Sequence, residues 1–129
     1  MSEVKKIVFL DVVTPAMRRT LADHVPAGFE LIFADADTEE KAVSAVADAD
    51  YVLVWSAYVP TRVVEAANRA RLIQKIGEGT DRIDVATAAR RGIPVAKTSG
   101  SNSASVAELA TLLILATMRW LPRAHNSMV

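Results

Sequence analysis

The chain has 129 residues, 51% of them apolar, with 15 basic and 15 acidic side chains and no cysteine. A chain of this length forms one ordinary domain with a hydrophobic core. Formal neutrality argues against nucleic acid as a partner, and the lack of cysteine excludes disulfides, thiolate metal sites and a cysteine nucleophile. The two histidines, His24 and His125, lie far apart without an acidic cluster, so we expect no metal site.

The sequence predicts neither a secretory leader nor a membrane span. Ile7 to Leu10 is the only strongly apolar run near the start, whereas a leader needs about 7–15 such residues. The uncharged run from Leu109 to Met118 is short of the roughly 20 apolar residues that a spanning helix needs. We therefore expect a soluble, cytoplasmic protein with no membrane partner.

Short apolar runs alternate with amphipathic segments along the chain. The runs predict strands over residues 6–11, 29–34, 51–55, 72–76 and 93–96. The segments between them predict helices that begin after Thr14, after Thr38, at Pro60–Thr61 (through Ala70) and after Asp84. This alternation indicates an α/β fold with a doubly wound, five-stranded parallel sheet in the flavodoxin-like order 2-1-3-4-5.

The last predicted helix differs from the others. Ser105 and Glu108 fit a capping box at its start. From Val106 to Trp120 it is apolar almost all round, and a helix without a polar face has to be covered on every side. One sheet covers only one side, so we expect another copy or another domain to pack there.

Polar residues follow three of the predicted strands, at the sheet edge where open parallel sheets bind ligands. Ser56 follows the third strand, Gly77-Glu78-Gly79 the fourth and Asn102 the fifth. A Gly-x-Gly turn presents backbone N–H groups to an anion, but it also occurs as a plain tight turn. Asn102 offers an amide donor to a ligand, or satisfies its own backbone. Asp81 either stabilises the loop that contains it or belongs to a ligand site.

Other classes of protein with similar sequence patterns fit this sequence less well. The turn is not a dinucleotide fingerprint, since Arg82 stands where the third glycine belongs. A phosphorelay receiver needs an acceptor aspartate after the third strand, where Trp55 and Ser56 stand, and a flavodoxin needs a phosphate loop after the first strand. His24 is expected on the surface, far from the candidate edge.

Several segments, in this order and spacing, carry a family resemblance: residues 77–84, residues 88–95, Thr98 and residues 102–108. Together they resemble the amino-terminal part of the D-isomer-specific 2-hydroxyacid dehydrogenases. The resemblance implies a flavodoxin-like substrate domain, an inserted Rossmann domain for NAD or NADP, and an active site in the cleft between them. It implies a small 2-hydroxy or 2-keto acid as substrate.

The resemblance also implies roles for particular residues. Backbone N–H groups of Gly77, Glu78 and Gly79 would bind the substrate carboxylate, although an inward-pointing Glu78 side chain would repel it. Asn102 would orient the substrate, and Val106 would lie beside the nicotinamide. Ser56 belongs to a loop that often carries Arg-Ser in relatives. Here Trp55 replaces the arginine, which puts a phosphorylated substrate in doubt.

No catalytic residue is expected within these 129 residues. The family's glycine-rich dinucleotide turn, its substrate-binding arginine and its Glu–His pair have no match. We therefore expect residues 1–104 to form the substrate domain and residues 105–129 an interdomain or dimerisation helix of a truncated, inactive enzyme. The alternative is a non-enzymatic module that forms homodimers through residues 106–120.

Overall fold

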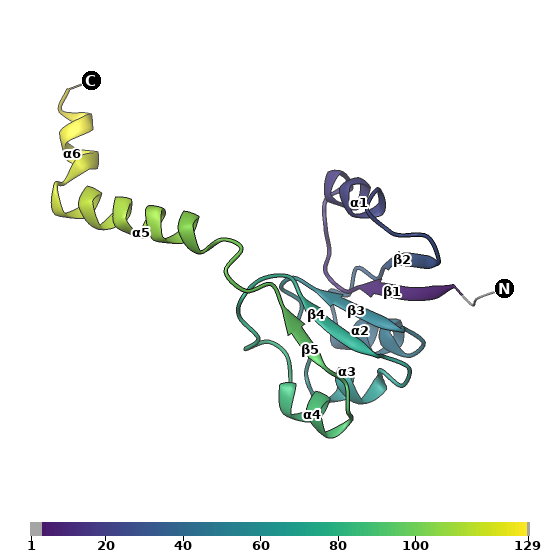
Figure 1. Cartoon of the computed structure of the whole chain (residues 1–129). Helices are drawn as coiled ribbons and strands as arrows, with labels where there is room; N and C mark the ends of the chain where they lie inside the picture. Colours follow the sequence, from purple (N-terminus) through teal and green to yellow (C-terminus); the bar gives the residue numbers. More distant parts are fainter. Residues whose placement is uncertain (1–3, 129) are drawn as a thin grey trace. The chain divides into compact units, whose positions relative to one another are not determined.

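The computed structural model describes residues 4–128, which divide after Thr98 into two compact units (Figure 1). The first unit holds a sheet and four helices. Its elements are β1 (Lys5–Phe9), α1 (Pro15–Ala22), β2 (Phe29–Phe33), α2 (Glu39–Val46), β3 (Tyr51–Val54), α3 (Thr61–Ala66), β4 (Leu72–Lys75), α4 (Val85–Arg90) and β5 (Val95–Lys97). The second unit holds α5 (Ser103–Met118) and α6 (Leu121–Asn126).

The five strands form one parallel sheet in the order β2-β1-β3-β4-β5, which confirms the predicted topology. The register places Phe9 beside Leu53 and Val54 beside Lys75, so β1, β3 and β4 end at the same edge of the sheet. Loops that follow these strands therefore lie next to one another. This edge is the one at which the sequence predicts a ligand site.

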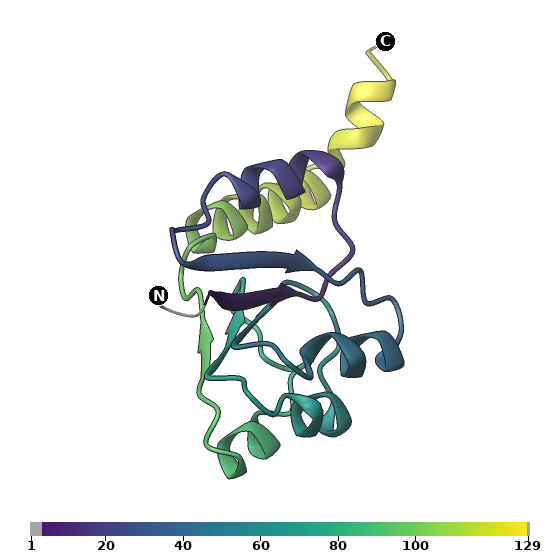
Figure 2. The ribbon, with the colours of Figure 1, turned by 90° about the vertical axis from the view of Figure 1, so that its right-hand side faces the viewer.

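Helices α2, α3 and α4 cover one face of the sheet, and α1 lies on the other (Figure 2). The hydrophobic core lies under the three helices, where Val8, Val52 and Ile73 point from the strands toward Val46 and Val64. The face that carries α1 is less well covered, because α1 has no buried residue. Met17 and Leu21 of α1 are only half-buried.

Three predicted helix caps are confirmed. Thr14 and Thr38 accept hydrogen bonds from the backbone N–H groups three residues later, and Asp84 does the same for Thr87 at 2.9 Å. Asp84 also accepts hydrogen bonds from the hydroxyls of Thr61 and Thr87. These bonds, the Thr61 bond foremost, lower the pKa of the Asp84 carboxyl to about 2.

Some boundaries differ from the prediction. Helix α3 ends at Ala66 instead of Ala70, because Ala67 leaves the helical conformation with a ψ of 68°. The chain turns there so that the backbone N–H of Arg71 can donate to the carbonyl of Asp50. The last strand is shifted toward the carboxyl end, from the predicted 93–96 to Val95–Lys97.

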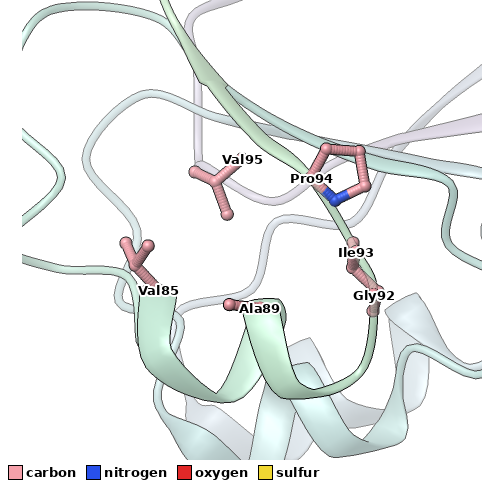
Figure 3. A pocket seen from close by; sticks show the side chains of 6 residues that line it. All are labelled: Val85, Ala89, Gly92, Ile93, Pro94 and Val95. Carbon is pink, nitrogen blue, oxygen red and sulfur yellow. The ribbon is translucent and has the colours of Figure 1, made fainter.

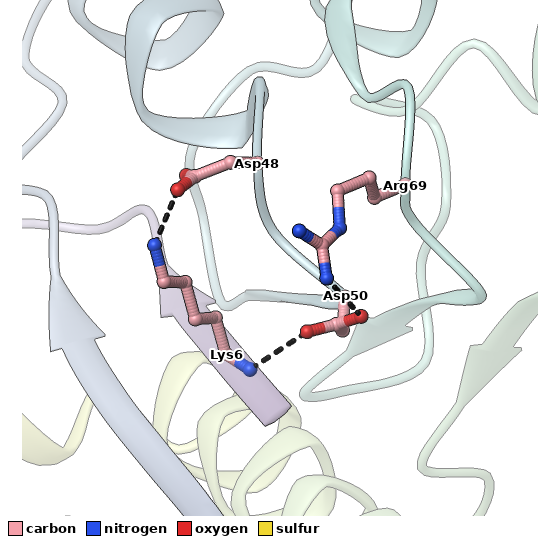
Figure 4. Close-up of polar contacts among 4 residues, drawn as sticks. All are labelled: Lys6, Asp48, Asp50 and Arg69. Atoms are coloured by element: carbon pink, nitrogen blue, oxygen red, sulfur yellow. Dashed lines mark hydrogen bonds and ion pairs between the residues drawn. The ribbon is translucent and has the colours of Figure 1, made fainter. Parts of the chain in front are cut away.

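A buried carboxylate secures the opposite edge of the sheet, where β1 and β3 begin (Figure 4). Asp50 is almost fully buried and accepts a 2.9 Å hydrogen bond from the backbone N–H of Lys6. Arg69 lies 3.5 Å from its other oxygen. The hydrogen bond from Lys6 is the main reason that the pKa of Asp50 is lowered. The Lys6 side chain pairs with Asp48.

Helix α5, the long helix of the second unit, begins and ends at residues other than those predicted. Asn102, not Ser105, is the cap residue of α5, and it makes no side-chain capping bond, so the predicted capping box is wrong. The turn at Gly100, with φ +73°, starts the helix earlier. The helix stops at Met118 because Pro122 lacks an N–H and its ring would clash with the carbonyl of Met118.

Trp120 therefore lies outside α5, in the left-handed conformation with φ +52°, and not inside a helix that runs through it. The apolar side chains of α5, among them Leu109, Leu113 and Ile114, are exposed in the structure. None of the helices within residues 4–128 has both the length and the apolar character to cross a membrane.

Candidate functional site

The loops after β3 and β4 lie side by side at the carboxyl edge of the sheet. The backbone N–H of Ile76 donates to the carbonyl of Val54 at 2.7 Å, which extends the strand pairing to the start of both loops. Further along, Val59 pairs with Ile83 in an isolated parallel bridge. The structure thus brings the predicted site residue Ser56 next to Gly77, Glu78 and Gly79.

The Gly77–Gly79 turn, the predicted anion cradle, has a backbone conformation at Gly77 that favours glycine. Gly77 adopts φ +122°, which side chains disfavour, and a Cβ on Gly79 would lie 2.7 Å from Oδ1 of Asp81. Within the part of the chain that the structure describes, the backbone N–H groups of Gly77 and Gly79 donate to no protein acceptor. Two donors are therefore available for an anion such as a carboxylate, whereas the Asp81 carboxylate beside Gly79 opposes an anion at that end of the turn.

Lys75 places a positive charge against this cradle. Its ammonium group donates to the carbonyl of Ile76 at 3.1 Å and contacts the carbonyl of Trp55. A Cβ on Gly77 would lie 3.4 Å from the same Nζ atom. Because the ammonium touches both loops, it favours an anion at the cradle and joins the two loops.

The side chain of Glu78 pairs with Lys97. We expected an inward-pointing Glu78 side chain to repel the carboxylate of a ligand in the cradle. The Lys97 ammonium at the end of β5 offsets that charge instead. Thr98, which directly follows β5, also holds the turn in place, since its backbone N–H donates to the carbonyl of Gly77 at 3.1 Å.

A residue that sequence reasoning did not select, Asp11, shapes the loop after β3. Its carboxylate is 5% exposed and accepts hydrogen bonds from the backbone N–H groups of Trp55 at 2.6 Å, Ser56 at 2.5 Å and Ala57 at 2.7 Å. The hydroxyl of Ser56 also donates to Oδ1 of Asp11, at 2.8 Å. The Ser56 hydroxyl is therefore oriented toward Asp11.

Arg82 completes the connection between the loops. Its guanidinium donates to the carbonyl of Ser56 at 2.7 Å, and the backbone N–H of Val59 donates to the carbonyl of Arg82 at 2.8 Å. At the position of the missing third glycine, the arginine thus holds the two loops together. Lys75 and Arg82 were both missed as site residues, because their roles depend on the contact between neighbouring strands.

Asn102 and Val106 belong to the second unit, which begins at Ser99. Asn102 caps α5 through its backbone, and Val106 lies in the first turn of the helix, with its side chain exposed. The predicted roles of these two residues toward substrate and nicotinamide stay predictions. The side chain of Asn102 makes no capping bond, so helix capping does not occupy its amide.

Beside the cradle loops lies a polar hollow of about 190 Å³ whose lining includes Asp81, Arg82 and Asp84. A second hollow and the histidine His24 offer no polar site. The second hollow, of about 520 Å³, lies between α4 and β5. Figure 3 shows the side chains that line it: Val85, Ala89, Gly92, Ile93, Pro94 and Val95. No ionisable side chain lines it. His24 is exposed, with Nδ1 2.7 Å from the carbonyl of Thr20, as expected for a surface residue. Within residues 4–128, no group of three or more acidic or histidine side chains could hold a metal ion.

Comparison with known proteins decides the family. The model of the "D-isomer specific 2-hydroxyacid dehydrogenase, catalytic domain" matches residues 7–126, which is nearly the whole chain. The chain belongs to this family. Among curated dehydrogenases of the family, the D-3-phosphoglycerate dehydrogenase of Sus scrofa is 30% identical over 128 residues, and that of Mycobacterium tuberculosis is 34% identical over 123 residues.

Solved structures of dehydrogenases agree with this assignment. The NAD-dependent formate dehydrogenase of Staphylococcus aureus, solved with NAD, superposes with a TM-score of 0.76 at 27% identity and covers 96% of this chain. The NAD⁺-bound 3-phosphoglycerate dehydrogenase of Entamoeba histolytica gives 0.71 at 26% identity and covers 87%. The chain spans 24% of the Sus scrofa dehydrogenase, 41% of the formate dehydrogenase and 38% of the Entamoeba enzyme.

Proposed function

We propose that residues 1–104 form the substrate-binding domain of an NAD(P)-dependent D-2-hydroxyacid dehydrogenase. The observation that carries the proposal is the Gly77–Gly79 turn, with two backbone donors available and the Lys75 ammonium against it. A carboxylate is the anion common to 2-hydroxy and 2-keto acids, and paired N–H groups beside a cation bind it by charge-assisted hydrogen bonds. Membership of the dehydrogenase family supports this ligand.

In this proposal each site residue has a defined task. Gly77, Glu78 and Gly79 bind the carboxylate through backbone N–H groups, and Ser56 forms the neighbouring wall of the site. Asn102 orients the substrate through its side-chain amide. The hydride is exchanged with NAD or NADP, which Val106 would contact at the nicotinamide. The exposed side chain of Val106 fits such a contact.

We propose that the isolated 129-residue chain transfers no hydride. Its residues include no match to the family's dinucleotide turn, substrate-binding arginine or Glu–His pair. The chain mixed with NADH and glyoxylate, or with NADH and hydroxypyruvate, is expected to oxidise no more NADH than a blank without protein. NADH oxidation that exceeds the blank and co-purifies with the chain would refute this part of the proposal.

A second candidate is a non-enzymatic module that forms dimers. The exposed apolar side chains of α5 favour it, since a helix of this composition is stable in water only when something covers it. The cradle favours the enzyme instead, because a module that only dimerises has no use for an anion site. Binding of a 2-hydroxy acid to the cradle therefore separates the two candidates.

A further inference from the structure

Glu78 is the central residue of the cradle, so its side chain carries a negative charge close to any ligand bound there. Because the side chain is short, its carboxylate stays within about 10 Å of the ligand, which is the Debye length at about 0.1 M salt. Two charges at this separation are not fully screened from each other. An unpaired Glu78 would therefore weaken the binding of every anion at the turn.

Lys97, the last residue of β5, forms an ion pair with Glu78, in which its ammonium group donates to Oε1 of the carboxylate. The pairing of the strands places Lys97 beside Lys75, the last residue of β4. The next residue, Thr98, donates its backbone N–H to the carbonyl of Gly77 at 3.1 Å and its hydroxyl to the carbonyl of Lys75 at 3.3 Å. The backbone of Lys97 is thus fixed against the turn that carries Glu78.

Lys97 also decides the local charge around the cradle. The segment that forms the end of β4 and the turn carries two cations and two carboxylates: Lys75, Arg82, Glu78 and Asp81. These four charges cancel. Lys97 adds one positive charge from the neighbouring strand. The net attraction of this part of the molecule for a ligand carboxylate therefore depends on Lys97.

We infer that Lys97 is a positioning residue for the carboxylate site: by holding the Glu78 side chain in an ion pair, it allows an anion to bind at the Gly77–Gly79 turn. The inference rests on the proposed function. Lys97 acts through Glu78, whereas the ligand carboxylate is bound by the backbone N–H groups of the turn. The side chains of Lys97 and Glu78 are 44% and 54% exposed, and exposed ion pairs contribute little to stability. Removing the pair is therefore expected to change binding and not folding.

The test is a titration of the ¹⁵N-labelled chain and its variants with glycolate, followed by amide shifts in NMR spectra. Lys97→Met is expected to weaken glycolate about tenfold, because it leaves Glu78 unpaired beside the ligand. Adding Glu78→Gln to Lys97→Met is expected to restore most of the affinity, and Lys97→Arg is expected to keep it. Raising the salt concentration should weaken glycolate binding by the unmodified chain more than by Lys97→Met. Lys41→Met, which removes the exposed ion pair with Asp37 at α2, is the matched control and leaves the affinity unchanged.

The outcomes separate the inference from the proposed function. Equal affinity of Lys97→Met and the unmodified chain overturns the inference and leaves the carboxylate cradle in place. A loss in folded Lys97→Met that Glu78→Gln does not restore also overturns the inference, since Lys97 would then not act through Glu78. Failure of the unmodified chain to bind glycolate overturns the proposed function and the inference together. A loss in Lys97→Met that the double variant restores supports both.

Discussion

Ser56 donates two hydrogen bonds to the same oxygen of Asp11, from its backbone N–H at 2.5 Å and from its hydroxyl at 2.8 Å. The two residues are 45 positions apart in the chain and meet because β1 and β3 are neighbours in the sheet. The buried carboxylate gathers three consecutive backbone N–H groups and so fixes the loop beside the Gly77–Gly79 cradle. The shape of one wall of the site thus depends on a residue from another strand.

Asp11→Ala is predicted to destabilise the fold by about 3 kcal/mol, because it leaves buried backbone donors without an acceptor. Asp11→Asn keeps one oxygen acceptor and is predicted to cost less than half as much. Urea unfolding followed by circular dichroism measures both values. A cost for Asp11→Ala below about 0.5 kcal/mol would mean that the loop does not depend on this carboxylate.

Gly77→Ala is predicted to abolish glycolate binding by the chain and to destabilise the fold by about 1–3 kcal/mol, since alanine is strained at φ +122°. Gly28→Ala is the matched control. Gly28 also has a positive φ, of +87°, and an added Cβ there meets nothing within 4 Å. The control should lose stability to a similar degree yet keep its affinity for glycolate. Equal affinity in both variants would show that the turn is only a structural one.

Acid stability is predicted to depend on Asp84. Its pKa is lowered to about 2 by hydrogen bonds from Thr61 and Thr87 that favour the ionised form. A carboxyl with a lower pKa in the folded state stabilises the fold above its ordinary pKa of 3.8, and this contribution is lost as pH falls from about 4 toward 2. Asp84→Asn should therefore lower the urea midpoint at pH 6 and flatten its fall below pH 4.

The control for this pH dependence is Asp23→Asn, a change at an exposed carboxylate whose side chain has no hydrogen-bond partner among residues 4–128. This variant should follow the unmodified chain at every pH. If Asp84→Asn and the unmodified chain lose stability in parallel between pH 4 and pH 2, the Asp84 hydrogen bonds do not contribute as described.

The apolar surface of α5 is predicted to make the 13.9 kDa chain self-associate. Leu113→Glu, in the middle of the exposed surface, should shift the mass measured by light scattering toward that of the monomer. Val85→Glu serves as the control, since Val85 is also exposed but lies at the start of α4. A monodisperse monomer of the unmodified chain over a wide concentration range would contradict the prediction.

Local signals in the sequence predicted the fold well. Thr14, Thr38 and Asp84 were recognisable as caps because a cap acts on N–H groups only three residues away. The strand order followed from the alternation of strands and helices, which leaves few topologies open. Ser105 and Glu108 matched the same kind of local pattern, but the turn at Gly100 starts the helix before them.

The site was only half predictable, because its supports come from distant parts of the chain. The glycines of the cradle and Ser56 stand out as small and polar residues after strands. Asp11 and Lys75 do not, since a carboxylate after β1 and an ammonium at the end of β4 acquire their roles only when the strands are paired. A polar residue at the end of a strand that borders a predicted site is the signal that would have identified them.

The central claim is that the Gly77–Gly79 turn binds a carboxylate, and amide shifts of the ¹⁵N-labelled chain during a glycolate titration test it most directly. The account predicts that the N–H signals of Gly77 and Gly79 move with one common affinity, while those of Gly28 and Gly92 stay in place. Signals of Gly77 and Gly79 that remain still at saturating glycolate, or that move no more than those of Gly28, would contradict it.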